Sequence, residues 1–272
     1  MEFFMFAKRF LSAVVLLALA GIALITGGTF LLVLSVVVAL AGTFELLRID
    51  NMHKTVPGCI SYISVIGFYL ILFREYTGLT EVWLVIAVLL MLAAYVITYP
   101  KHHVRDIALC LLAVIYVGVL VSYVYQTRCM PYGRWFVWLI LIGASGSDTF
   151  AYLVGRCVGK HHFSDLSPKK TIEGCIGGVL GAVLLAGIYS FFLPQEAVQM
   201  FDWNVHLAFV CIGMLCSVVS QIGDLAASAI KRNYGVKDYS SLIPGHGGIM
   251  DRFDSIIFVS PLVYYLIHWF VS

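Results

Sequence analysis

Residues 206–230 read HLAFVCIGMLCSVVSQIGDLAASAI, and residues 231–254 continue KRNYGVKDYSSLIPGHGGIMDRFD. The first stretch is long enough to cross about 30 Å of hydrocarbon as a helix. The second cannot continue that helix, because Pro244 lacks a backbone donor and the glycines around it favour open backbone. The two stretches therefore predict a membrane helix that ends in a polar loop, and the rest of the chain is interpreted around this loop.

The whole chain has the composition of a membrane protein. Its 272 residues are 61% hydrophobic and 12% charged, and the mean hydropathy is +0.95. These values exclude an ordinary soluble domain, in which about a quarter of the residues are charged. Apolar runs of spanning length occur at residues 10–26, 28–47, 57–73, 80–99, 105–125, 135–155, 174–193, 206–230 and 254–271. Since the runs lack the alternation of a barrel strand, we expect an all-α polytopic membrane protein of about nine transmembrane helices.

The basic residues predict the orientation of these spans. With the N-terminus in the cytoplasm, 14 of the 17 Lys and Arg residues lie on the cytoplasmic side, which leaves Arg74, Arg128 and Arg134 outside. This distribution follows the positive-inside rule and places the charged loops where nucleotides are found. A net charge of +2 gives no support to a nucleic-acid partner. The loop charge and the lack of an organelle signal favour a bacterial inner or plasma membrane.

The first apolar run has an alternative interpretation as a cleaved leader. Lys8 and Arg9 precede it, and Ala18-Leu19-Ala20 resembles a cleavage site. An equally apolar second run follows at once. We therefore predict that the first span is retained.

Polar chemistry is concentrated in the C-terminal half. We predict an N-terminal scaffold of five spans at residues 1–134, and a catalytic region of four spans with two cytoplasmic loops at residues 135–272, which places the active site on the cytoplasmic side. Within the scaffold, Glu45 and Arg48 stand three residues apart at the end of a span. That spacing predicts an interfacial ion pair.

The sixth predicted span carries an acid at membrane depth. An Asp in the middle of an apolar helix costs roughly 2.5 to 3.5 kcal/mol on insertion scales, which favours a functional role for Asp148. Asp148, Tyr152 and Arg156 recur every four residues and should share one helix face. That face leads into a loop whose candidates for binding phosphate are Lys160, Ser167, Lys169 and Lys170.

The same loop predicts where the seventh helix begins. Ser167 is a good capping residue, and Pro168 suits a first helical turn. The N-terminus of a helix attracts anions, so this start would add to a phosphate site. A capped helix with interfacial lysines and no substrate is the alternative interpretation.

The eighth span becomes polar along its length. Ser220, Asp224, Ser228 and Lys231 stand at i, i+4, i+8 and i+11, which places them in one stripe along a helix. A buried stripe that ends in a Lys-Arg pair should line a water-filled site.

Both polar regions resemble those of a known enzyme family. The chain is similar to the signature of the phosphatidate cytidylyltransferases, the CDP-diacylglycerol synthases, at Ser228, Lys231-Arg232, Lys237-Asp238, Ser240, Ile243-Pro244, His246-Gly247-Gly248, Asp251-Arg252 and Asp254. A second resemblance to this family runs from Asp148 through Gly155-Arg156 and Gly159-Lys160 to Ser167-Pro168. Ser147, Phe150 and Ala227 depart from the residues that many members carry.

The resemblance implies transfer of a cytidylyl group from CTP to phosphatidate in the bilayer, which gives CDP-diacylglycerol and pyrophosphate for phospholipid synthesis. It also implies a homodimer. Nucleotidyl transfer brings several negative charges together, so the site has to supply cations and alignment rather than a covalent nucleophile. Mg²⁺ is the expected cofactor, and a second cation would suit an in-line displacement.

Residue roles follow from this chemistry and from the resemblance. The expected metal ligands are Asp224 and Asp251, with Asp148 as a third candidate. The expected catalytic group is Asp224, Asp251, Lys231, Arg232 and His246. The expected substrate-binding residues are Arg156, Lys160, Ser167, Lys169, Lys170, Ser228, Lys237, Gly247, Gly248 and Arg252. For His246, a hydrogen-bonded turn residue is the alternative to a group that protonates or orients phosphate.

Three other functions stay open at this point. A secondary transporter also places acids within spans, although here the charges lie in one half of the chain rather than in paired inverted halves. A different CTP-dependent lipid kinase or nucleotidyltransferase, such as a polyprenol kinase, would keep the basic loops and change the acceptor. A noncatalytic scaffold would have no reason to carry three acids within or beside the spans on one side.

Overall fold

The structure of the chain is a computed structural model that describes residues 14–15, 17–75, 77–164, 166–168, 170–243, 245 and 247–271. Within these residues the fold is helical, with two isolated β-bridges and no strand. The described residues contain eight helical segments that are long and apolar enough to cross a membrane. These segments are Gly28–Arg48, Val56–Phe73, Thr80–Thr98, Val104–Cys129, Gly133–Val158, Ile172–Ser190, Val205–Asn233 and Met250–Phe270. The prediction of an all-α polytopic membrane protein is confirmed.

The segments agree with the predicted spans to within a few residues. The span predicted at residues 10–26 falls partly outside the described residues, and the described remainder forms a shorter apolar helix, Leu17–Thr26. The eighth predicted span is longer than expected, because its helix runs on to Asn233 and keeps Lys231 and Arg232 helical. The orientation of the spans stays a prediction.

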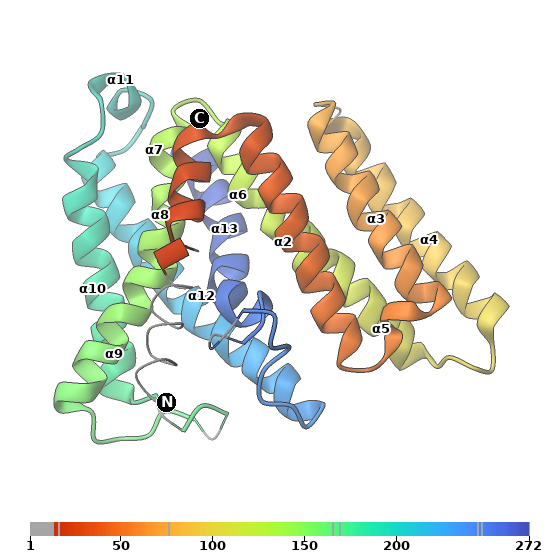
Figure 1. The fold of residues 1–272 in the computed structure, drawn as a ribbon. Helices are drawn as coiled ribbons and strands as arrows, with labels where there is room; N and C mark the ends of the chain where they lie inside the picture. The colour runs from red at the N-terminus through yellow and green to blue at the C-terminus, as the bar shows by residue number, and fades with distance from the viewer. Residues whose placement is uncertain are drawn as a thin grey trace. The chain divides into compact units, whose positions relative to one another are not determined.

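The segments divide into the helices labelled in Figure 1. In chain order these are α2 (Gly28–Arg48), α3 (Val56–Phe73), α4 (Thr80–Thr98), α5 (Val104–Leu112), α6 (Leu120–Cys129), α7 (Gly133–Phe136), α8 (Trp138–Leu141), α9 (Ser147–Val158), α10 (Ile172–Ser190), α11 (Gln195–Val198), α12 (Val205–Asn233) and α13 (Met250–Phe270). Two π-helical segments, η3 (Ala113–Val119) and η4 (Ile142–Gly146), continue α5 into α6 and α8 into α9. Two 3-10 turns, η1 (Met52–Lys54) and η2 (Thr77–Leu79), precede α3 and α4.

The chain forms two compact units. Unit 1 comprises Met1–Tyr125 and Tyr234–Arg252, and unit 2 comprises Gln126–Asn233 and Phe253–Ser272. The helix α13 contributes its first turn to unit 1 and its remaining turns to unit 2. The predicted division at residue 134 into a scaffold and a catalytic region concerns function, and it stays a prediction.

Unit 1 is built on α2, α3 and η3, which pack against one another, while α4 packs on α3. The indole N–H of Trp83 in α4 donates to the Ser64 carbonyl of α3 at 2.8 Å. The segment Tyr234–Arg252 belongs to this unit, where Met250 lies beside Gly42 of α2. The polar loop after the eighth predicted span is therefore held by N-terminal helices.

Unit 2 is built on α9, α10 and α12, with η4 packed against α10 and α12. The contact of α9 with α10 is close because α10 presents glycines. A Cβ atom on Gly177 would lie 2.5 Å from Val154, and one on Gly178 would lie 2.9 Å from the Ser147 carbonyl oxygen. The spacing of Gly174, Gly177, Gly178 and Gly181 in the sequence predicts a close helix contact for the seventh span, and the structure confirms it.

This contact predicts a difference between two glycine substitutions in α10. Gly178→Ala is expected to lower the free energy of unfolding by about 1–3 kcal/mol, since its Cβ would meet backbone that cannot move aside. Gly187→Ala is the matched control, because its Cβ would meet Val210 at 3.4 Å, an ordinary contact. Thermal unfolding of the detergent-purified variants measures the difference, and equal melting temperatures would contradict the prediction.

Candidate active site

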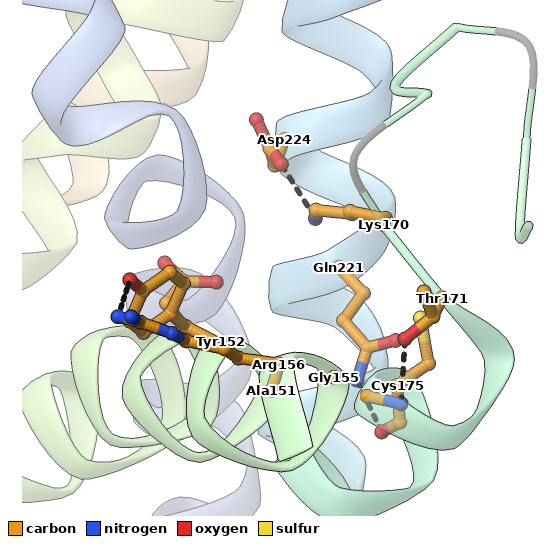
Figure 2. A pocket seen from close by; sticks show the side chains of 11 residues that line it. Ala151, Tyr152, Gly155, Arg156, Lys170, Thr171, Cys175, Gln221 and Asp224 are labelled. Carbon is orange, nitrogen blue, oxygen red and sulfur yellow. Dashed lines mark hydrogen bonds and ion pairs between the residues drawn. The ribbon is translucent and has the colours of Figure 1, made fainter. Parts of the chain in front are cut away.

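Unit 2 contains a polar pocket of about 430 Å³, shown in Figure 2. Three elements converge on it, namely α9, α12 and the start of α10 with the residues just before it. The lining consists of Asp148, Ala151, Tyr152, Gly155, Arg156, Lys170, Thr171, Gly174, Cys175, Gln221 and Asp224. The pocket thus brings together four predicted site residues from sequence positions up to 76 residues apart, Asp148, Arg156, Lys170 and Asp224.

Asp148, Tyr152 and Arg156 all line the pocket, so the predicted shared face of the sixth span is confirmed. The guanidinium of Arg156 donates from Nη1 to the Tyr152 hydroxyl at 3.0 Å. The opposite wall carries Gln221, whose amide donates to the Cys175 carbonyl at 3.0 Å and so ties α12 to α10 (Figure 2). One cationic and one acidic side chain of α9 therefore face the same space.

Charges of both signs meet in the pocket. Lys170 Nζ lies 2.5 Å from Asp224 Oδ2, and both side chains are largely buried (Figure 2). Asp148 interacts electrostatically with both residues, and its Oδ2 lies 3.5 Å from the hydroxyl of Ser255, which donates to it. The single positive charge of Lys170 offsets part of the negative charge of the two carboxylates, which lowers the cost of holding them within the protein.

Asp254, which closes the signature that resembles the family, is an acid of this region without a predicted role. It lies in α13, accepts the Ser255 N–H at 2.8 Å, and interacts electrostatically with Asp224, Asp148 and Lys231. In the sequence, a role for Asp254 was indicated only by its position three residues after Asp251 in the polar stretch 231–254. Unit 2 therefore gathers three carboxylates and two lysines.

The donor set fits a hard cation that is shared with phosphate. Within the described residues, no group of three or more His, Cys, Asp or Glu side chains is arranged as a ready-made metal cage. Mg²⁺ does not require such a cage, since it is usually bound by one or two carboxylates together with water and substrate phosphates. Asp148 and Asp224 supply two carboxylates to one pocket, which is the set that this mode of binding needs.

The floor of the pocket, where α9 meets α10, includes two glycines. Gly155 of α9 faces Gly174 of α10, and a Cβ on Gly174 would lie 2.7 Å from the Ala151 carbonyl oxygen. The Thr171 hydroxyl accepts the Gly174 N–H at 3.1 Å and caps α10. Any side chain larger than hydrogen at these two glycines would close the floor or push the helices apart.

The prediction that the seventh helix begins at Ser167 and Pro168 is wrong. Helix α10 begins at Ile172, and its cap is Thr171. The preceding residues fold back on themselves, because Phe163 donates its N–H to the Lys170 carbonyl and Ile172 donates to the His161 carbonyl. Backbone used in this way cannot also form a helical turn, so Ser167 lies in a loop rather than at a helix end.

The loop of unit 1 is held through Asp251. Its Oδ2 atom accepts the N–H groups of Tyr239 and Gly248, each at 2.9 Å. Gly248 is a predicted substrate-binding residue, but its N–H is already donated to Asp251 within the protein. Gly247 adopts φ +81°, a conformation that side chains disfavour, which explains a glycine there.

Glu45 is a second carboxylate bound to this loop, and the predicted interfacial pair is wrong. Its side chain is 0% exposed. Its Oε1 accepts the Ser240 hydroxyl at 2.5 Å and the Ile249 N–H at 2.9 Å, and its Oε2 accepts the Met250 N–H at 2.8 Å. An acid within an apolar run is a signal of function by itself, although the sequence could not name its partners.

The remaining predicted residues that the structure describes are not among those that line the pocket. Ser228 and Lys231 are half-buried on α12, while Lys160, Arg232, Lys237 and Arg252 have exposed side chains. Lys169 and His246 are outside the described residues. The roles of all these residues in binding and catalysis stay predictions.

The known proteins that this chain resembles belong to one enzyme family. A sequence profile of the cytidylyltransferase family matches residues 7–270. A protein of Staphylococcus haemolyticus named phosphatidate cytidylyltransferase is 36% identical over 268 residues, which cover 94% of this chain and 96% of that protein. Proteins with the same name from Staphylococcus aureus and Staphylococcus epidermidis are 35% identical over 270 and 265 residues, with the same coverage.

The loop before α10 gives a prediction that needs no substrate. The carboxylate of Glu173 accepts the N–H groups of Lys160 and His161 and lies 2.6 Å from His161 Nδ1, so it holds the start of the loop. Glu173→Gln is expected to increase tryptic cleavage within residues 160–170 several-fold, because local opening becomes easier. Glu196→Gln in α11 is the matched control, and equal cleavage of the two variants would contradict this role.

Proposed function

The chain belongs to the cytidylyltransferase family, and we propose that it transfers the cytidylyl group of CTP to phosphatidate, forming CDP-diacylglycerol and pyrophosphate. The observation that carries the proposal is the match, over 94% of the chain, to relatives that share one enzyme name. This name favours cytidylyl transfer over the transporter and lipid kinase considered from the sequence. The eight apolar helices among the described residues, together with the bacterial relatives, make the chain a multi-pass bacterial membrane protein, which suits an acceptor that resides in the bilayer.

The reaction joins two phosphates. A phosphate oxygen of phosphatidate attacks the α-phosphorus of CTP, the bond from that phosphorus to the bridging oxygen of the β-phosphate breaks, and pyrophosphate leaves with the bonding electrons. The attacking phosphate is already ionised, so no general base is assigned. The protein has to neutralise charge and hold the two phosphates in line.

Two basic side chains of the pocket suit this task. Lys170 and Arg156 line the same space as the acids, and each would bind phosphate oxygens by charge-assisted hydrogen bonds. Lys170 is paired with Asp224, so a bound triphosphate would compete for the same ammonium group. Lys231, near Asp254, is the next candidate.

Mg²⁺ is the proposed cofactor, and Asp224 and Asp148 are the proposed ligands. When bound, the cation neutralises charge on phosphate oxygens. Asp251 keeps its predicted place as a ligand, and Asp254 adds a carboxylate that interacts with both pocket acids. The donor set supports this proposal because hard oxygen ligands that are shared with phosphate are what Mg²⁺ prefers.

Several finer predictions are carried forward as part of the proposal. We propose that the other predicted residues bind the substrates or act in catalysis. These residues are His246, Arg232, Ser228, Lys237, Arg252, Lys160, Ser167, Lys169 and Gly247. We also propose a second cation, a homodimer and a cytoplasmic N-terminus, and we propose no nucleic-acid partner. Size measurement of the detergent-solubilised protein tests the dimer directly.

The activity is tested by pyrophosphate release from purified protein given CTP, phosphatidate and Mg²⁺. We expect release that requires all three components and that falls by about 100-fold or more in Asp224→Asn, because a charged group in the pocket is lost. Asp202→Asn, on the loop before α12, is the control and should retain activity. Failure of folded wild-type protein to release pyrophosphate with either CTP or dCTP would refute the proposed function.

Removal of the metal gives a separate prediction. Treatment with EDTA is expected to abolish pyrophosphate release, and Mg²⁺ should restore it. Mg²⁺ with CTP should also raise the melting temperature of the wild-type protein, because a ligand that binds only the folded state stabilises it. The rise should be absent in Asp224→Asn, and full activity in EDTA would show that the assigned cation is wrong.

A further inference from the structure

We propose that Glu45 of α2 is a positioning residue for the proposed reaction, because its carboxylate supplies the N-terminal cap of α13 and fixes the loop that leads into Asp251. This inference rests on the proposed function for its kinetic test only. Glu45 and the loop both belong to unit 1, and 203 residues separate Glu45 from Gly248 in the chain. The sequence analysis had assigned the N-terminal spans a scaffold role.

The start of α13 lacks a capping side chain of its own. The first N–H groups of a helix have no partner within it, and a Ser, Thr, Asp or Asn side chain at the cap usually accepts one of them. Here Gly248 and Ile249 precede Met250, the first residue of α13. Glycine has no side chain to offer, and the N–H groups of Ile249 and Met250 donate instead to Glu45 at 2.9 and 2.8 Å.

The carboxylate of Glu45 fills the place that a side chain at residue 248 would take. A Cβ atom on Gly248 would lie 2.5 Å from Glu45 Oε2 and 2.7 Å from its carboxyl carbon. The φ angle of Gly248 is not in the left-handed region, so the backbone itself does not call for a glycine. A side chain at residue 248 would therefore displace the Glu45 carboxylate from the groups that donate to it.

Asp251 completes the cap from the other side. It accepts the Gly248 N–H from three residues further on, which is the arrangement of the acidic partner in a capping box. Asp251 also accepts the Tyr239 N–H, while Glu45 accepts the hydroxyl of Ser240. Asp251 and Glu45 therefore each accept hydrogen bonds from both ends of the loop, which are residues 239–240 and 248–250.

A charged group at this position does more than a neutral cap would. The N-terminus of a helix is a ready site for an anion such as phosphate, and the substrates of the proposed reaction carry many phosphate oxygens. The Glu45 carboxylate accepts the N–H groups of Ile249 and Met250, so these groups are not free to bind a phosphate. Substrate phosphates are thereby directed to the basic side chains, and Asp251 stays in a fixed orientation.

The first test compares Glu45→Gln with Glu81→Gln, an exposed acid at the start of α4 in the same unit. Gln keeps the shape but can accept through one oxygen only. We expect kcat to fall by about 10- to 100-fold, as for other groups that orient a functional residue, with the KM for CTP changed by less than about threefold. Amide hydrogen exchange of residues 239–250 should rise in Glu45→Gln and stay unchanged in Glu81→Gln.

The second test is a rescue, which remains informative if Glu45→Gln folds poorly. Gly248→Ser alone should increase exchange in the loop and lower the melting temperature, because its Cβ would collide with Glu45. In the Glu45→Ala background the same serine has room and can cap the helix itself, so Glu45→Ala/Gly248→Ser should show lower loop exchange than Glu45→Ala. If Gly248→Ser is equally damaging in both backgrounds, the inference is overturned.

The two tests separate this inference from the proposed function. If wild-type protein releases no pyrophosphate, the proposed function fails, while loop exchange and the rescue still report on the cap. If wild-type protein is active and Glu45→Gln matches it in kcat and in loop exchange, the inference about Glu45 fails by itself. A loss of loop protection without a loss of kcat would reduce Glu45 to a structural role and would also overturn the inference.

Discussion

A charge within a membrane protein has to find its partner inside the protein, and both units of this chain are arranged by that requirement. In unit 2 the partner of Asp224 is Lys170, which comes from the segment before α10. In unit 1 the partners of Glu45 are backbone N–H groups and one hydroxyl from a loop some 200 residues later. Each pairing joins segments that hydrophobic packing alone would not fix relative to one another. In a membrane the lipid tails are as apolar as leucine side chains, so apolar contacts between helices are hardly better than contacts with lipid.

The fold was largely predictable because the rules that govern it are local. A run of apolar residues has to become a helix in lipid, where no water can satisfy its backbone. For the same reason the spacing of Asp148, Tyr152 and Arg156 was sufficient to place them on one face, and they do line one pocket. The spacing of the glycines in α10 likewise indicated a close helix contact, which the structure contains at Gly177 and Gly178.

The parts that were missed depend on contacts between distant residues. The start of α10 was placed too early, because the pairing of residues 161–163 with 170–172 competes with the helix and is invisible in local preferences. Glu45 was paired with Arg48, its neighbour in sequence, whereas its partners are in the loop before α13. Asp251 and Asp254 are both acids of one helix turn, and only the structure distinguishes the one that binds loop N–H groups from the one that interacts with the pocket acids.

The glycine floor of the pocket limits how its shape can change. Where α9 meets α10, the wall consists of Gly155 and Gly174, so no side chain there can be shortened to make more room. Substitutions at these two glycines can only fill the pocket or push α9 and α10 apart. A change at either glycine therefore alters the volume of the pocket wall in one direction only.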